Sequence, residues 1–294
     1  MSTSVDGPIL AIDTSTPTLV TGLVSGVGLS AADVRPGSTD IANAEAETEA
    51  RAGAAYEAVE NTVENTRAHN ELLMPTIFEL LDSAGIQLRE LAAVVVGCGP
   101  GPFSGLRVGM ATASSLGHAL GIGVYGVCSH DAIAWRAQYE QNDASKELAD
   151  GLLVATDARR RETYWAVYGS ANTAAVNNLA TATDPLGATP ATIGSSENQT
   201  VCRMTGPEVG PAENLQPEVA RVVANPTIAA RLPENLRELA EADTAPAVPS
   251  ARGLVAVADF NVAPRPLTPL YLRRPDAKEP VAKPVSAALR WADR

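Results

Sequence analysis

The sequence predicts an α/β fold of two duplicated lobes, each with a mixed sheet flanked by helices. The main observation is a motif that occurs twice, about 145 residues apart: an apolar strand ending in aspartate, a polar turn and a second strand. The first copy is Ile9–Asp13 followed by Leu19–Ser25, and the second is Gly151–Asp157 followed by Glu162–Tyr168. Helical and strand patterns alternate between the two copies, so we expect a duplicated α/β domain.

Three segments follow from this duplication. Residues 1–140 form an N-terminal lobe with an acidic insertion at 35–66, and residues 151–268 form a C-terminal lobe. Residues 269–294 form a C-terminal segment that ends in a basic tail. The polar run 141–150 marks the boundary between the lobes.

Composition limits the classes of function. The chain has 294 residues, of which 45% are apolar, which is enough for the cores of two domains. Its formal net charge of −12 argues against free-standing nucleic-acid binding, because affinity for phosphate backbones comes mainly from clustered Lys and Arg. Work on RNA inside a complex, where a partner supplies positive surface, remains open.

Cysteine usage and hydropathy indicate a cytoplasmic protein. The three cysteines are scattered and form no CxxC pair, which is typical of reduced thiols. Residues 1–8 contain no apolar core of a signal peptide, and no apolar run approaches the roughly 18–20 residues that cross a bilayer. We expect no membrane association.

The N-terminal lobe opens with a three-strand meander whose weak third strand is Leu29–Val34. The insertion 35–66 that follows is rich in Ala and Glu and almost free of large apolar residues. Such a segment buries little surface, so we expect a mobile loop or a solvated helix. It is either a lineage-specific insertion or an acidic arm that meets a basic partner.

A helix is predicted over His69–Ala84, because Leu72, Leu73 and other leucines recur at 3.6-residue spacing. Pro75 should kink this helix or mark its first turn, and Gly85 should end it. Leu91–Val96 is too apolar for a strand with one wet face, so we expect a central parallel strand.

A glycine-rich turn, Gly99–Gly105, leads from this strand into a helix that runs from about Gly105 to Leu120. Four small residues recur on one stripe of the helix, although glycine costs about 1 kcal/mol relative to alanine in a helix interior: Gly105, Gly109, Ala113 and Gly117. Close approach of another helix would compensate. That helix is either His69–Ala84 of the same chain or a helix of a partner.

Weaker patterns complete the chain. Ser129 is placed to cap a helix over Asp131–Tyr139, and most of residues 169–200 is expected to be loop. Further elements are predicted at Gly123–Val127 (strand), Val201–Thr205 (strand), Arg237–Ala242 (helix), Arg252–Asp259 (helix) and in the compact segment Pro269–Arg273.

The two aspartate turns are candidate contacts for a nucleotide or another anion. In duplicated α/β domains of the actin and sugar-kinase type, such turns hold phosphates and a carboxylate positions Mg²⁺. The residues concerned are Asp13, Thr14, Ser15, Asp157 and Arg159. The competing interpretation is that each aspartate simply forms a turn.

The sequence lacks the motifs of three other kinds of site: a P-loop, a histidine metal site and the active site of a serine hydrolase. The glycine turn could bind an anion at a helix N-terminus, but it lacks the Lys-Ser/Thr ending of a P-loop. The three histidines show neither H-x-x-x-H nor H-E-x-x-H spacing, so no metal site is expected. No G-x-S-x-G elbow of a serine hydrolase occurs.

Five segments in this order resemble the TsaB (YeaZ) family: ILAIDTST from Ile9, HNELLMP from His69, GCGPGPFSGLRVG from Gly97, DARRRETY from Asp157 and PLYLR from Pro269. The resemblance implies an actin-like (ASKHA, RNase H-like) fold. It further implies a non-catalytic subunit of the bacterial machinery that makes N6-threonylcarbamoyladenosine in tRNA. Pro102 and Ser104 depart from the family pattern, which weakens nucleotide binding by the hydroxyls of the glycine turn. Arg161 replaces the smaller residue that the family usually has in the second aspartate turn.

The resemblance also implies partners. Family members dimerise with the catalytic subunit TsaD through N-lobe helices, a small ATPase called TsaE joins them, and tRNA is bound through the complex. Carried over, the interface residues are His69, Leu72, Leu73, Gly105, Gly109, Ala113 and Gly117. No cofactor is required by this chain, and ATP or ADP is a candidate ligand at the subunit interface.

Two alternatives remain open at this point. One is an enzyme of the same fold, either an ATP-binding phosphotransferase or an M22-like peptidase, for which the paired aspartate turns are the motive. The other is a regulator that self-associates as a homodimer through the same helices.

Overall fold

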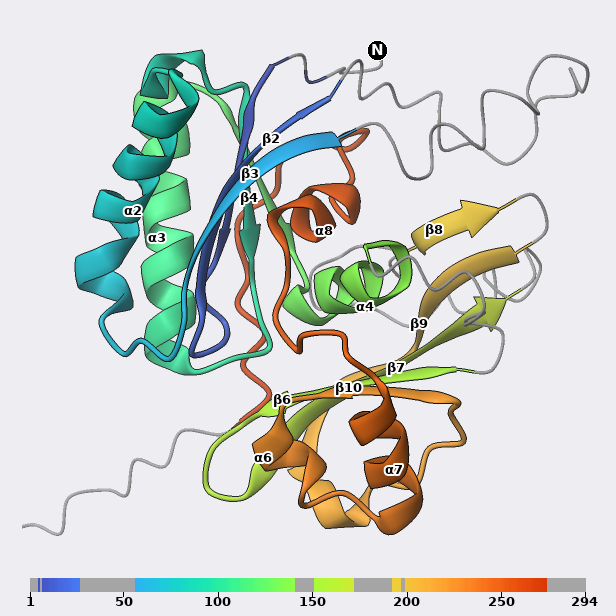
Figure 1. The fold of residues 1–294 in the computed structure, drawn as a ribbon. Coiled ribbons are helices and arrows are strands. Elements are labelled where there is room, and N and C mark those ends of the chain that lie inside the picture. Colours follow the sequence, from blue (N-terminus) through green and yellow to red (C-terminus); the bar gives the residue numbers. More distant parts are fainter. Residues whose placement is uncertain are drawn as a thin grey trace, which may run out of the picture.

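The computed structural model describes residue 5 and residues 7–26, 56–140, 151–171, 192–196 and 199–273. Figure 1 shows two sheets with helices packed between and outside them. Helices α2 (His69–Ala84) and α3 (Phe103–Leu120) cover the outer face of the first sheet, and α6 (Pro226–Ala229) and α7 (Glu234–Ala242) cover that of the second. Between the sheets lie α4 (Ser129–Tyr139) and α8 (Ala251–Ala256). The predicted two-lobed α/β fold is confirmed.

The first sheet has the strand order β3-β2-β1-β4-β5. Strand β1 pairs antiparallel with β2 and parallel with β4, which also pairs parallel with β5, so β4 is the central parallel strand that its apolar sequence predicts. The strands are β1 (Ile9–Asp13), β2 (Leu19–Gly26), β3 (Tyr56–Val63), β4 (Ala93–Gly97) and β5 (Gly123–Val127), with a short 3-10 helix at Leu88–Glu90.

The second sheet repeats the central pattern of the first. Its order is β10-β6-β7-β9-β8, and β6 pairs antiparallel with β7 and parallel with β10, as β1 does with β2 and β4. The predicted duplication is thus present in the strand topology. The strands are β6 (Leu152–Asp157), β7 (Glu162–Ala171), β8 (Thr192–Ser196), β9 (Gln199–Pro211) and β10 (Arg221–Ala224), with a 3-10 helix at Ala212–Asn214.

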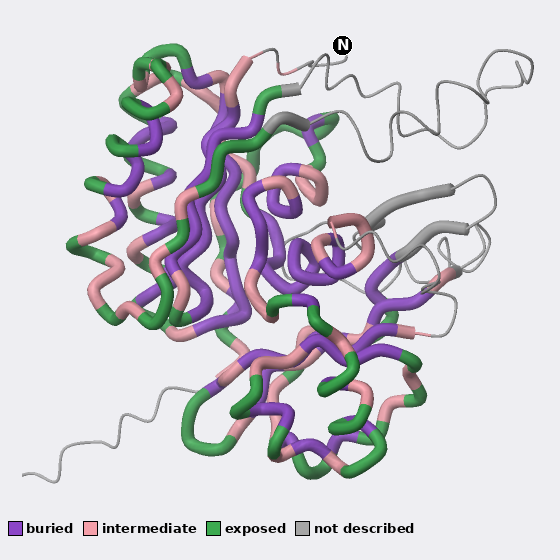
Figure 2. The backbone as a smooth tube through the Cα atoms, viewed as in Figure 1, coloured by how far each residue is buried: buried purple, intermediate pink, exposed green. Residues whose placement is uncertain are grey.

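Buried residues concentrate on the central strands and on the inner faces of the helices, as the purple stretches in Figure 2 show. Every residue of β1 and β4 is buried, so both faces of these strands contribute to a core. One core lies under α2 and α3, and another joins the opposite face of the sheet to α8 through Ala251, Leu254 and Val255. Helix α8, which lies within the predicted C-terminal lobe, thus packs on the first sheet.

The acidic segment differs from the prediction. Residues Tyr56–Val63 form β3, which pairs antiparallel with β2 in the register Leu19↔Val63 to Gly26↔Tyr56. The expectation of a loop or solvated helix is wrong here, because an edge strand needs only one backbone partner and leaves polar side chains in solvent. Residues 35–55 of the predicted insertion and the predicted strand Leu29–Val34 lie outside the described residues.

The small-residue stripe of α3 faces the chain's own first sheet. A Cβ added to Gly109 would lie 2.4 Å from Thr14 Oγ1, and one added to Gly117 would lie 2.2 Å from Val124 Cγ2. Gly105 approaches the Thr14 carbonyl in the same way, and Ala113 is fully buried. The compensating close approach is therefore made by the turn after β1 and by β5, not by α2. These four residues are covered within the chain and offer no surface to a partner.

Several boundaries also move. Helix α2 runs through Pro75 from His69 and ends at Gly85, whose φ is 66°. Helix α4 begins at Ser129, which makes no capping hydrogen bond. Strands β8 and β9 occupy parts of the predicted loop 169–200, α7 begins three residues earlier than predicted and α8 ends at Ala256. Within the described ranges, none of the helices combines the length and apolar character needed to cross a membrane.

Candidate functional site at the cleft between the lobes

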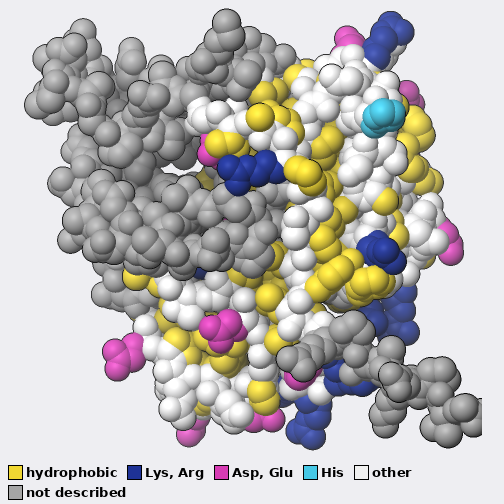
Figure 3. Space-filling view, turned by 180° about the vertical axis from the view of Figure 1, so that it is seen from behind, with side chains coloured by type: hydrophobic (Ala, Val, Ile, Leu, Met, Phe, Trp, Pro, Cys, Tyr) yellow, Lys and Arg dark blue, Asp and Glu magenta, His cyan; other side chains and the backbone are white. Residues whose placement is uncertain are grey.

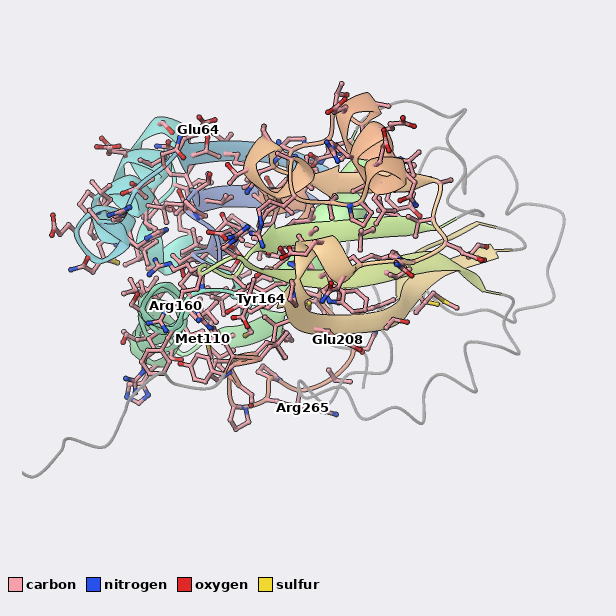
Figure 4. All side chains as sticks on the ribbon, turned by 90° about the horizontal axis from the view of Figure 1, so that it is seen from below. Glu64, Met110, Arg160, Tyr164, Glu208 and Arg265 are labelled. Atoms are coloured by element: carbon pink, nitrogen blue, oxygen red, sulfur yellow. The ribbon has the colours of Figure 1, made fainter. Side chains whose placement is uncertain are left out.

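A cavity of about 610 Å³ opens between the two lobes. Four segments of the chain line it: the turn after β1, the loop before α2, the start of α3 and the turn after β6. The lining residues are Thr14, Thr16, Pro17, Asn65, Thr66, Arg67, His69, Pro102, Ser104, Gly105, Asp157 and Arg159. Figure 4 shows Arg160 and Tyr164, which come from the second lobe, on the side of the molecule where α3 with Met110 lies.

The first aspartate turn is locked into the core. Asp13 is fully buried, and its Oδ1 accepts hydrogen bonds from the Ser15 N–H at 2.8 Å and the Ser15 hydroxyl at 2.7 Å. Its Oδ2 accepts a hydrogen bond from the Ser129 hydroxyl at 2.6 Å. Burial raises the pKa of the Asp13 carboxyl, although these hydrogen bonds act in the opposite direction. Both oxygens are thus used inside the protein, and neither Asp13 nor Ser15 lines the cavity.

The start of α4 joins the ends of the two equivalent strands. Ser129 donates to Asp13 at the end of β1, and the next residue, His130, places Nε2 2.8 Å from Thr156 Oγ1 near the end of β6. His130 is fully buried, and burial lowers its pKa to about 3, with the Arg203 cation acting in the same direction. The imidazole is therefore neutral at ordinary pH. The first turn of α4 therefore contacts both strand ends.

A buried ion pair anchors the same helix to the second sheet. Arg203 Nη1 of β9 lies 3.1 Å from Asp131 Oδ1, and the Tyr168 hydroxyl of β7 donates to that oxygen at 2.8 Å. The two charged side chains are 6% and 3% exposed. If α4 moved away from the second sheet, the pair would separate and leave uncompensated buried charges, which is costly. The pair therefore holds α4 against the second sheet.

The second aspartate turn is open to the cleft. Asp157 is half-buried and accepts a hydrogen bond from the Arg159 N–H at 3.0 Å. Arg159, Arg160 and Arg161 are exposed and have φ angles of 62°, 50° and 68°. This left-handed region is uncommon for residues other than glycine, so three consecutive arginines there are an unusual feature of the rim.

The glycine turn packs closely on the first aspartate turn. A Cβ added to Gly101 would lie 2.3 Å from the Ser15 carbonyl oxygen, so only glycine permits this approach. The Gly99 carbonyl accepts a hydrogen bond from the Ser129 N–H at 2.7 Å. Across the cleft, the Tyr164 hydroxyl lies 3.5 Å from the Gly101 carbonyl oxygen. The turn is therefore a packed support for the start of α3.

The segment Pro269–Arg273 crosses from one lobe to the other. The Leu270 N–H donates to the Cys98 carbonyl of the first lobe at 2.9 Å. Arg273 Nε then pairs with Glu162 Oε2 of the second lobe at 2.9 Å, and its Nη1 donates to the Ala158 carbonyl. These contacts explain why this short, compact sequence stands apart from the proline-rich residues around it.

The structure brings some of the predicted anion contacts together and separates others. Thr14, Asp157 and Arg159 line one cavity, whereas Asp13 and Ser15 lie beneath it. His69 also lines the cavity, with Nε2 3.1 Å from the Thr16 carbonyl oxygen, and burial lowers its pKa. Sequence reasoning missed Arg67, which lies just before the predicted helix and shows no motif of its own.

The remaining interface candidates lie on α2 and differ in their exposure. Leu73 is buried in the core, whereas His69 and Leu72 keep part of their surface. Phe78 on α2 is 53% exposed, and Pro75 is exposed one turn before it. The outer face of α3 is formed mostly by small side chains, including exposed Ser104, Ala111, Ser114, Ser115 and Ala119.

Within the described ranges, no group of three or more His, Cys, Asp or Glu side chains lies close enough together to hold a metal ion. The three cysteines are unpaired and buried, and burial raises the pKa of Cys98 to about 12. These thiols are therefore protonated packing groups.

The family described as "TsaD: tRNA N6-adenosine threonylcarbamoyltransferase" has a model that matches residues 59–278. An uncharacterized protein of Mycobacterium tuberculosis is 41% identical over 219 residues, which cover 74% of this chain and 82% of that protein. The tRNA threonylcarbamoyladenosine biosynthesis protein TsaB of Escherichia coli is 36% identical over 107 residues, which cover 35% of this chain and 42% of that protein.

Among solved structures, YeaZ from Pseudomonas aeruginosa aligns with a TM-score of 0.52 at 21% identity, covering 85% of this chain and 90% of that one. This likeness supports the fold. The family model, the relatives named TsaB and the five sequence segments agree with one another. The chain belongs to the TsaB (YeaZ) family, within the group of proteins that the threonylcarbamoyltransferase model describes.

Proposed function

We propose that this chain takes part in the biosynthesis of N6-threonylcarbamoyladenosine in tRNA as a non-catalytic subunit that binds a TsaD-like catalytic subunit. Relatives named for this biosynthesis and the matching family model support the process. In this proposal tRNA and a TsaE-like ATPase join through the complex.

The outer faces of α2 and α3 support the partner-binding part of the proposal. Phe78 is more than half exposed, and the chain has only three phenylalanines with which to fill its cores. Large apolar side chains that are left exposed often mark interaction sites. Beside α2, the small outer side chains of α3 permit close approach of a partner helix. The inner stripe of glycines then serves to press α3 onto the sheet, so it positions the interface without forming it.

The state of Asp13 supports a non-catalytic role. A phosphotransferase with this fold would use carboxylates that reach the cleft between the lobes. Asp13 is buried beneath the cavity with both oxygens occupied, and only Asp157 of the pair lines the cavity. An assay of the purified chain for ATP hydrolysis and peptide cleavage tests the enzyme alternatives, and turnover that depends on Asp157 would contradict our proposal.

Co-purification with the TsaD-like subunit of the same organism tests the interface. We expect Phe78→Glu and Ala111→Trp to reduce the captured partner at least tenfold while leaving the melting temperature unchanged. Val262→Glu is the matched control, because Val262 is 39% exposed and lies outside these helices. Normal capture by both helix variants would contradict the interface. Light scattering without the partner separates a homodimer through the same faces from a heterodimer.

We also propose that a nucleotide such as ADP contacts the cleft when the complex is assembled. The cavity presents Arg67 and Arg159 together with the hydroxyls of Thr14 and Thr16, which are suitable groups for a phosphate. Calorimetry with the assembled complex should detect ADP binding that Arg159→Ala weakens. The matched control is Arg89→Ala, on an exposed residue away from the cavity. Equal binding by both variants would remove the cleft from the nucleotide site.

A further inference from the structure

We propose that the rim of the cleft formed by Phe103, Tyr271 and the arginines beside them binds unpaired nucleotides of an RNA. This proposal rests on the proposed function, because it identifies the surface through which this subunit would contact the tRNA. We call this surface the aromatic–arginine rim; its arginines are Arg107, Arg159, Arg160 and Arg273.

The aromatic part consists of two exposed rings that meet from distant parts of the chain. Phe103, the first residue of α3, is 54% exposed, and Tyr271 of the C-terminal segment is 41% exposed. Their ring centroids are 4.8 Å apart with an angle of 32° between the planes. Rings of this kind are the usual platform on which unpaired bases stack.

Arginines surround the ring pair. The Arg107 guanidinium carbon lies 4.7 Å from the centroid of the Phe103 ring. Arg273 follows Tyr271 by two residues and is fixed by Glu162. Arg159 lines the same cavity as Pro102 and Ser104, the two neighbours of Phe103. Figure 3 shows Lys and Arg side chains beside hydrophobic ones in the lower right of that face.

The backbone of the arginine turn supports a role for its side chains. Left-handed residues other than glycine are unfavourable, and Gly or Asn would fit the three φ angles of 62°, 50° and 68° better. The turn itself is closed by backbone hydrogen bonds, from the Glu162 N–H to the Arg159 carbonyl and from the Ala158 N–H to the Glu162 carbonyl. Strained positions of this kind cluster at binding sites, where side-chain function offsets the backbone cost.

Charge and chemistry favour RNA over an acidic protein. The whole chain has a net charge of −12, yet the rim contains four arginines. In the sequence, residues 274–294 contain five Lys or Arg against three Asp or Glu. An acidic peptide would use the cations and leave the rings in solvent. An unpaired stretch of RNA uses both, because its phosphates pair with arginines and its bases stack on aromatic rings.

The test is fluorescence anisotropy of the full chain at low salt, with a labelled RNA hairpin that has an unpaired loop. A fully paired duplex of the same composition is the comparison ligand. Loss of one stacked base contact corresponds to roughly a 5- to 150-fold change in Kd. We therefore expect Phe103→Leu and Tyr271→Leu each to weaken hairpin binding at least fivefold, while Tyr271→Phe retains it. Met204→Leu is the matched control, because Met204 is 40% exposed and lies on β9, outside both the rim and helices α2 and α3.

The arginine turn gives a second measurement. Arg160→Gly should weaken binding and reduce the slope of log Kd against log salt concentration, because one phosphate contact is lost. It should not reduce the melting temperature. This combination separates a lost contact from a lost fold.

Three results would overturn the proposal: no hairpin binding at low salt, equal binding of duplex and hairpin, or unchanged affinity in both ring-to-leucine variants. If those variants lose capture of the TsaD-like subunit instead of RNA, the rim is a protein interface and the proposal is also overturned. Weaker RNA binding with normal partner capture supports it. Failure of partner capture by the unmodified chain would contradict the proposed function and leave the RNA result standing.

Discussion

The two aspartate turns share one sequence pattern and one strand pairing, yet they differ in almost every contact. Asp13 is fully buried and accepts three hydrogen bonds, whereas Asp157 borders the open cleft and accepts one, from the Arg159 N–H of its own turn. The first turn is packed under glycines, and the second continues into three exposed arginines. The first turn is therefore part of the packed core, whereas the second lies at the rim of the cavity.

The first turn should be sensitive to any added volume. A Cβ on Gly97 would lie 1.8 Å from Asp13 Oδ2 and 2.5 Å from Ser129 Oγ, so Gly97→Ala forces apart the turn and the start of α4. We expect a loss of at least about 3 kcal/mol in the free energy of unfolding, measured with urea. Gly210→Ala is the control, because no atom lies within 4 Å of its added Cβ. Equal losses would show that the first turn is not tightly packed.

The next effect compares the two carboxylates directly. Asp13→Ala leaves the Ser15 and Ser129 donors without their acceptor, and we expect it to lower the free energy of unfolding by about 2 to 3 kcal/mol. Asp157→Ala removes one hydrogen bond at an exposed turn and should change it by about 0.5 kcal/mol. Urea denaturation of both variants gives the comparison. Similar values would mean that the two turns have the same structural role.

The buried His130, which connects the start of α4 to Thr156 near the second turn, should make the stability of the protein depend on pH. Burial lowers the pKa of His130 to about 3 from an ordinary 6.5, so between these values the unfolded chain binds more protons than the folded one. The stability that His130 contributes is present above about pH 6.5 and is lost as the pH falls. From pH 7.5 to pH 5 this loss is about 2 kcal/mol.

His130→Gln keeps a polar group near Thr156 without titrating, so its stability should fall less over this interval. The raised pKa of Asp13 acts in the opposite direction, since its stabilising contribution is lost as the pH rises. That contribution is common to both proteins and cancels when they are compared. Chemical denaturation at the two pH values measures the difference, and parallel curves would show that His130 titrates normally in the folded state.

Much of the fold could be predicted because it depends on local patterns. The paired strand–aspartate–turn–strand motifs, the apolar run of β4 and the helical periodicity of α2 all correspond to elements of the structure. The acidic strand β3 was missed because an edge strand buries little of its side-chain surface, so its composition matches that of a solvated segment.

The site depended on contacts that no local pattern encodes. The stripe on α3 indicates close approach, but only the topology shows that the approaching group is Thr14, ninety-one residues before Gly105. Likewise, Ser129 fits a helix cap by type and position, and its hydroxyl instead bonds to Asp13, which is brought there by the sheet. The contact between the Phe103 and Tyr271 rings likewise depends on the topology, which brings distant parts of the chain together.

The smallest expected change in the free energy of unfolding concerns the second aspartate turn, and it is a gain, whereas the changes above are losses. Arg160 has a φ of 50°, which glycine adopts without a Cβ clash. Arg160→Gly should therefore raise the free energy of unfolding by about 1 kcal/mol, after allowance for the greater freedom of glycine in the unfolded chain. Urea denaturation measures this gain, and Arg89→Gly in the 3-10 helix Leu88–Glu90 is a control that should lower stability. A loss in Arg160→Gly would mean that the arginine side chain stabilises the turn. A gain means that the backbone of the second turn, unlike that of the first, is strained by a residue other than glycine.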